Sequence, residues 1–88
     1  MAKQLCALTA LIAVMTVATL GPAAARDCKL YAIQSAKQQK TNETKSCGFS
    51  GAGWTKDLKA HEAFCSSVAP TIWRAELTKR QKMLEKCK

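Results

Sequence analysis

Four cysteines spread evenly over the last two thirds of an 88-residue chain limit most strongly what it can fold into. Cys28, Cys47, Cys65 and Cys87 are separated by 19, 18 and 22 positions. Structural zinc sites usually take their ligands from close pairs such as Cys-x-x-Cys, so this spacing argues against metal. A domain this small needs covalent support beyond its core. The sequence therefore predicts two disulfides, no metal and no cofactor.

The N-terminus has the pattern of a secretory signal peptide. Lys3 gives a positive start, positions 5–20 form an apolar run, and Ala23-Ala24-Ala25 offers a small-residue cleavage site. The run is shorter than the roughly 20 residues of a membrane-spanning helix, so we expect no transmembrane segment in the mature form. We predict a signal peptide over residues 1–25 and one domain over residues 26–88, periplasmic or secreted, where disulfides form.

Three stretches of the domain have helical periodicity, and none alternates as a strand would. The first runs from 27 to about 44, and a glycine-rich loop at 46–53 follows it. In the second helix, Thr55 is expected to be the N-cap, with Asp57 in the first turn. The third is expected over Pro70–Cys87. The fold prediction is an all-α, up-down-up bundle of three helices cross-linked by two disulfides.

The order of the helices makes one disulfide pairing geometrically simple. In an up-down-up bundle, Cys28 and Cys65 lie at one end, and Cys47 and Cys87 lie at the other. Bridged cysteines need Cα atoms within about 7 Å, which favours Cys28–Cys65 with Cys47–Cys87. A shorter or tilted first helix would favour the alternative, Cys28–Cys87 with Cys47–Cys65. On the chain-entropy estimate each bridge adds roughly 3 to 4 kcal/mol.

Polar residues on the packing faces of the second and third helices predict a structural pair of contacts. Asp57 and His61 are four residues apart on one helix, a spacing that would also suit a general base. His61 is the single histidine of the chain and lies among apolar positions, which favours a structural, hydrogen-bonded role. Arg80 interrupts the apolar side of the third helix and needs an anion if buried. In an up-down-up register, Arg80 comes level with Asp57 and Glu76 with His61. These four residues form the predicted polar ladder.

Basic residues gather on the opposite side of the third helix. Lys79, Lys82 and Lys86 fall within a narrow angular range at 100° per residue, and the whole chain has a formal net charge of +8. Loss of residues 1–25 would remove Lys3 and leave about +7. Such a face attracts acidic protein, polysaccharide or lipid headgroups, and its plainer interpretation is a solvated helix exterior. Export argues against a nucleic-acid partner.

The cysteine and aromatic positions together resemble a known family. Its pattern is met at Cys28, Tyr31, Ala32, Cys47-Gly48-Phe49, Gly51, Trp54, Asp57, His61, Phe64-Cys65, Glu76, Arg80, Leu84 and Cys87. The chain is similar here to small exported four-cysteine proteins of alphaproteobacteria, especially rhizobia and their relatives; Phe64 stands where that family has Trp. The resemblance covers nearly all of the mature chain and implies the domain limits and an exported location. It implies no activity.

Three functional hypotheses follow from the sequence. The first is a small, cationic, non-enzymatic binding or structural module that recognises an anionic envelope or extracellular partner. The second is a membrane-active or host-directed secreted cationic peptide, which needs an exposed amphipathic surface. That need is hard to meet if the core takes up the large apolar residues Trp54, Trp73, Leu77 and Leu84. The third, an enzyme centred on Asp57 and His61, has the least support, and no catalytic residue is predicted.

Overall fold

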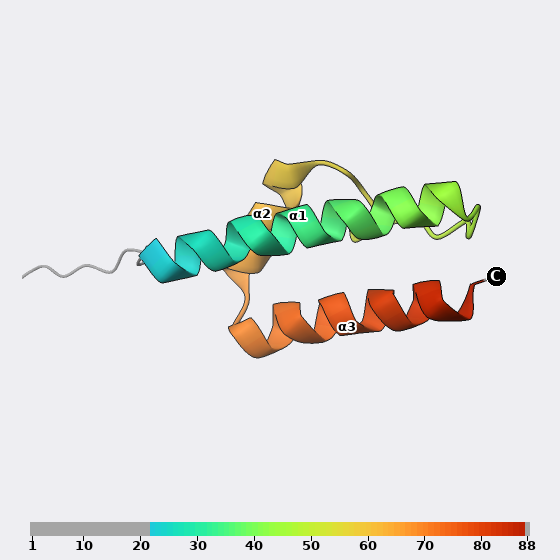
Figure 1. Ribbon diagram of the computed structural model, residues 1–88. Helices are drawn as coiled ribbons and strands as arrows, with labels where there is room; N and C mark the ends of the chain where they lie inside the picture. Colours follow the sequence, from blue (N-terminus) through green and yellow to red (C-terminus); the bar gives the residue numbers. More distant parts are fainter. Residues whose placement is uncertain (1–21, 88) are drawn as a thin grey trace, which may run out of the picture.

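The computed structural model describes residues 22–87, and all regular structure within them is helical. Helix α1 spans Pro22–Thr44, α2 spans Leu58–Ser67 and α3 spans Pro70–Lys86 (Figure 1). The predicted all-α bundle of three helices is confirmed. Of the predicted signal peptide, residues 1–21 lie outside the described part of the chain.

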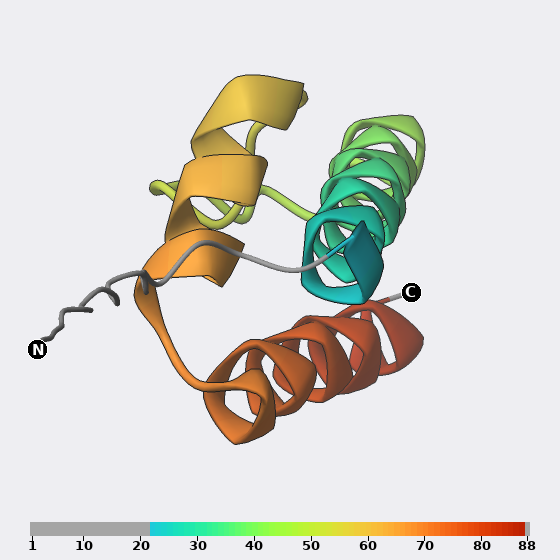
Figure 2. The same ribbon diagram turned by 90° about the vertical axis from the view of Figure 1, so that its left-hand side faces the viewer.

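Helices α1 and α3 lie side by side and run in the same direction, as the up-down-up order requires (Figures 1 and 2). Helix α2 crosses them steeply instead of running antiparallel to them. Its ten residues cover about 15 Å at 1.5 Å per residue, which is too short to retrace the 23 residues of α1. The chain therefore returns from the end of α1 through the irregular segment 45–57.

Two helix starts differ from the sequence prediction. Helix α1 begins at Pro22 and not at Asp27, since proline suits the first turn and the alanines after it are strong helix formers. In α2 the N-cap is Asp57, whose carboxylate accepts hydrogen bonds from the backbone of Lys59 and Ala60. Thr55, the predicted cap, instead accepts a hydrogen bond from the Asp57 amide. Asp57 therefore lies just before the helix rather than in its first turn.

Both disulfides form in the predicted pairing. Cys28–Cys65 joins the first half of α1 to the end of α2, with 5.5 Å between the Cα atoms. Cys47–Cys87 joins the segment after α1 to the end of α3, with a Cα separation of 5.8 Å. The alternative pairing, Cys28–Cys87 with Cys47–Cys65, is thus wrong.

The interior is small and unusually rich in polar side chains. Cys28, Tyr31 and Cys65 form its apolar centre, with Trp73 and Leu77 packed against them. Five polar residues are buried beside this centre: Ser35, Gln38, Asn42, His61 and Arg80. Buried polar groups are costly unless they are hydrogen-bonded, so the stability of the fold depends on their partners.

Asn42 on α1 holds the irregular segment in place. Its side-chain amide donates to the Phe49 carbonyl at 2.8 Å, and its side-chain oxygen accepts from the Phe49 amide at 3.1 Å. The Phe49 ring stacks on Trp54, with 4.8 Å between ring centroids. Gly48 adopts a φ of 81°, which a glycine accepts without strain. One buried amide therefore fixes the path of the chain between α1 and α2.

We expect Asn42→Ala to lower the free energy of unfolding by about 1 to 3 kcal/mol, because it leaves both backbone groups of Phe49 without their partner. Urea unfolding of the oxidised protein measures this change. Thr41→Ala is the matched control, since its hydroxyl bonds only the Lys37 carbonyl at the exposed surface. Equal losses in the two variants would contradict the role given to Asn42.

Candidate functional site

The centre of the polar interior is the guanidinium of Arg80. This side chain of α3 is 0% exposed. One terminal nitrogen, Nη1, donates to the Gly53 carbonyl, and the other, Nη2, donates to the Tyr31 hydroxyl and the Ser35 hydroxyl, both at 2.9 Å. The guanidinium carbon lies 5.5 Å from the centroid of the Tyr31 ring. Arg80 thus connects α3 to α1 and to the segment that precedes α2.

No carboxylate lies within ion-pair distance of Arg80 among residues 22–87. The two ion pairs there are Lys56–Glu43 at 3.1 Å and Lys79–Glu76 at 3.7 Å, both exposed or nearly so. The Asp57–Arg80 contact of the polar ladder is therefore wrong. Asp57 is exposed and caps α2, whereas the segment before it brings Gly53 level with Arg80.

The second contact of the polar ladder is also wrong. His61 is 2% exposed, and its Nε2 lies 2.7 Å from the Thr55 carbonyl. A carbonyl oxygen can only accept, so Nε2 carries the hydrogen in this contact. Glu76 pairs with Lys79 on its own helix. The predicted register fails because α2 crosses α3 steeply, so residues counted from the shared turn do not stay level (Figure 2).

His61 and Glu76 nevertheless line the same cavity, of about 270 Å³. Aromatic and small residues form most of its wall: Tyr31, Phe64, Ala52, Gly53 and Ala60. Asp57 is not among the lining residues, so the Asp57–His61 pair that suited a general base is not brought together there. Each of the two polar side chains already has a partner outside the cavity, Thr55 for His61 and Lys79 for Glu76.

The part of the chain that the structure describes has no cluster of three or more His, Cys, Asp or Glu residues arranged to hold a metal ion. Its four cysteines are all in disulfides.

The predicted basic face on α3 is exposed to solvent. Lys79 pairs with Glu76, and Lys86 lies in the last turn, where its charge complements the helix dipole. Lys82 lines an open groove of about 540 Å³ between α1 and α3. Glutamine and threonine side chains dominate the rest of that groove: Gln34, Gln38, Thr41, Thr78 and Gln81. Lys82 and Lys86 are therefore available to an external partner, whereas the exposed Lys79 has Glu76 as a neighbour on its own helix.

Basic residues on α1 extend this positive surface, and the sequence analysis did not single them out. Lys37 lines the groove beside Lys82, and Lys37, Lys40 and Lys45 surround a smaller hollow of about 360 Å³. Lys45 also donates from Nζ to the Leu84 carbonyl. The signal was present in the sequence, because Lys37 and Lys40 are three apart on a helix and share a face.

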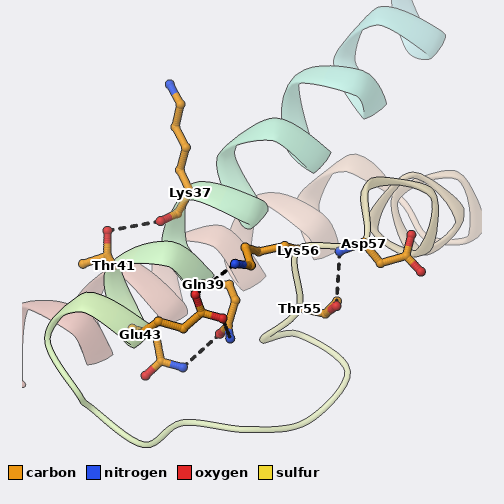
Figure 3. A network of polar contacts seen from close by, with 8 residues as sticks. Lys37, Gln39, Thr41, Glu43, Thr55, Lys56 and Asp57 are labelled. Carbon is orange, nitrogen blue, oxygen red and sulfur yellow. Dashed lines mark hydrogen bonds and ion pairs between the residues drawn. The ribbon is translucent and has the colours of Figure 1, made fainter.

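Helix α1 and the segment before α2 are also joined at the surface (Figure 3). The Lys56 ammonium lies beside the Glu43 carboxylate, which also accepts from Gln39 at 3.0 Å. Two hydrogen bonds lower the pKa of Glu43 below its ordinary value: the one from Lys56 has the larger effect and the one from Gln39 the smaller. Because both partners are exposed, solvent screens this interaction and it contributes little to stability.

Comparison with known proteins gives no assignment. The chain matches no protein-family model, and no curated protein or solved structure is detectably similar to it. The resemblance to exported four-cysteine proteins therefore stays an expectation from the sequence. Within residues 22–87, none of the helices combines the length and the apolar character needed to cross a membrane.

We expect Tyr31→Phe and Ser35→Ala each to lower the free energy of unfolding by about 1 to 3 kcal/mol, because each removes an acceptor from a buried cation. Asp57→Asn should change it by only a few tenths of a kcal/mol, because asparagine caps a helix about as well as aspartate. Urea unfolding compares the three variants. If Asp57→Asn were as damaging as Tyr31→Phe, the partners assigned to Arg80 would be incorrect.

The lowered pKa of Glu43 predicts a pH-dependent contribution to stability. A carboxyl group whose pKa is lower in the folded state stabilises it above the unfolded pKa, and this contribution disappears as pH falls through the folded pKa. The stability difference between the wild type and Glu43→Gln should be constant above about pH 5 and shrink below about pH 4. Unfolding curves at each pH measure it. A difference that grew at low pH would contradict the direction of the shift.

Proposed function

We propose that this protein is an exported, non-enzymatic cationic module that binds an anionic partner in the cell envelope or outside the cell. The observation that supports it best is the exposure of basic side chains on two helices: Lys79, Lys82 and Lys86 on α3, and Lys37 and Lys40 on α1. The chain as a whole carries 14 Lys and Arg against six Asp and Glu. Such an excess of positive charge attracts anions and accelerates their association.

The scaffold supports binding by a preformed surface. The helices that carry the lysines are cross-linked by Cys28–Cys65 and Cys47–Cys87. A cross-linked fold presents its charges in fixed positions, so little conformational entropy is lost when a partner binds. The same disulfides are consistent with an extracellular or periplasmic location, because such bonds persist in oxidising compartments. In this proposal, residues 1–25 are a signal peptide that directs the chain out of the cytoplasm.

The non-enzymatic part of the proposal rests on the partners of the side chains considered for catalysis. His61 is hydrogen-bonded to a backbone carbonyl, and Asp57 caps α2. A membrane-disrupting peptide has less support, because its large aromatic residues would need to be free. Trp54 is stacked on Phe49, and Trp73 packs on the core.

Binding to a soluble polyanion tests the proposal. We expect the oxidised protein to bind sodium polygalacturonate or polyglutamate at low ionic strength, with an affinity that falls steeply as salt approaches about 0.15 M, where the screening length is about 8 Å. The variant Lys79→Gln/Lys82→Gln/Lys86→Gln should bind more weakly, because it removes three positive charges from one face of α3. In the wild type the Lys56 ammonium is paired with Glu43, so the control Lys56→Gln should bind nearly as well as the wild type. Calorimetry at several salt concentrations measures this.

Two outcomes would overturn the proposal. One is no binding, at low ionic strength, of either polymer or of anionic lipid vesicles. The other is an affinity that does not change with salt, since binding driven by exposed charges must be screened.

A further inference from the structure

The outward side of α1 carries a continuous cationic stripe with two aliphatic residues in it. We call these seven residues the outer stripe: Arg26, Lys29, Leu30, Ile33, Lys37, Lys40 and Thr44. They recur at spacings of three and four, which places them on one side of a helix. Every one of them is exposed.

The outer stripe lies on the side of α1 away from the core, and of its members Lys37 also lines the groove between α1 and α3. The buried residues of α1 recur on its opposite side: Cys28, Tyr31, Ala32, Ser35, Gln38 and Asn42. Helices α2 and α3 lie against that buried side, and the other flank of α1 is uncovered (Figure 2). The acidic residues of α1, Asp27 and Glu43, fall outside the outer stripe at 100° per residue. Its charge is therefore of one sign.

Leu30 and Ile33 distinguish this surface from the basic face of α3. Their exposed fractions are 51% and 45%, and they are among the few large apolar side chains of the described residues that remain open to solvent. Lys29 and Lys37 flank them along the helix. A soluble polyanion would use the cations and leave these two side chains in water. A partner with an anionic surface and an apolar layer a few ångströms beneath it would bind the cations and also bury Leu30 and Ile33.

We propose that the outer stripe seats the protein on an anionic lipid surface, with α1 lying in the plane of the membrane. This inference rests on the proposed function and names its partner. From Arg26 to Thr44 the outer stripe extends about 27 Å in a straight line, which suits a flat surface. The lysines and Arg26 meet the headgroups, while Leu30 and Ile33 enter the interface, as in other amphipathic interfacial helices.

This contact between α1 and the membrane does not require the bundle to open. Tyr31 and Cys28, on the opposite side of α1, keep their places in the core. The two tryptophans, which could insert most deeply, stay packed in the fold, Trp54 on Phe49 and Trp73 on the core. Binding without leakage of vesicle contents is therefore the expected behaviour.

Vesicle binding tests the proposal. The oxidised protein is mixed with vesicles of phosphatidylcholine plus phosphatidylglycerol, and with vesicles of phosphatidylcholine alone, and the bound fraction is measured by co-sedimentation. We expect binding to the first and little to the second. Replacing Lys29, Lys37 and Lys40 by Gln should weaken vesicle binding roughly a hundredfold, at about fivefold for each cation. The matched control replaces Lys79, Lys82 and Lys86 by Gln and should lose far less.

A second pair of measurements separates this proposal from the broader one. Leu30→Gln/Ile33→Gln should weaken vesicle binding roughly tenfold or more and leave polygalacturonate binding unchanged, because only a membrane accepts the apolar side chains. Glutamine keeps the helix, and both sites are exposed, so the variant should fold.

The outer stripe is excluded as a lipid seat if phosphatidylglycerol adds nothing to vesicle binding. It is also excluded if the α3 control loses as much affinity as the α1 variant, or if the Leu30 and Ile33 changes have no effect. Salt-sensitive binding to polygalacturonate or polyglutamate alone would then leave the proposed function standing, with an acidic polymer or protein as its partner. Binding to neither vesicles nor polymers would remove both proposals.

Discussion

The buried guanidinium of Arg80 is the interaction on which the rest of the structure depends. An ionised side chain removed from water is costly unless hydrogen bonds compensate it. Here three neutral oxygens accept from the two terminal nitrogens of Arg80, while its Nε has no hydrogen-bond partner. Arginine suits this place because its planar fork directs several donors at fixed angles, which a lysine cannot do. The three acceptors come from Tyr31, Ser35 and Gly53, so one side chain of α3 fixes both α1 and the segment before α2.

The disulfides and Asn42 complete what Arg80 begins. Cys28–Cys65 and Cys47–Cys87 act at the two ends of the bundle, and Asn42 fixes the segment between them. Because covalent and polar contacts hold the interior together, the fold needs only a small apolar core. A large apolar side chain such as Leu30 can therefore remain exposed to solvent. The outer surfaces of α1 and α3 are then free to carry the positive charge from which a binding role is proposed.

The sequence predicted the elements with repeating patterns and missed those without one. Helical periodicity and the cysteine spacing were enough for the bundle and for the disulfide pairing. The partner of Arg80 was mispredicted as Asp57, because a buried cation suggests a carboxylate. One of its real partners is the carbonyl of Gly53, in the irregular segment before α2. The path of that segment depends on Asn42, and its sequence has no periodic pattern from which the contact could be predicted. The outer stripe could have been found from spacing alone, since its members recur at three and four.

The side-chain signals of Arg80 in nitrogen-15 NMR of the oxidised protein test the central claim most directly. A guanidinium held by Tyr31, Ser35 and Gly53 should give separate, slowly exchanging Nη protons with contacts to the Tyr31 ring, unchanged in Asp57→Asn. The exposed Arg26 provides the internal reference for a free side chain. Averaged, rapidly exchanging signals for Arg80 like those of Arg26 would contradict the claim that this cation holds the helices together.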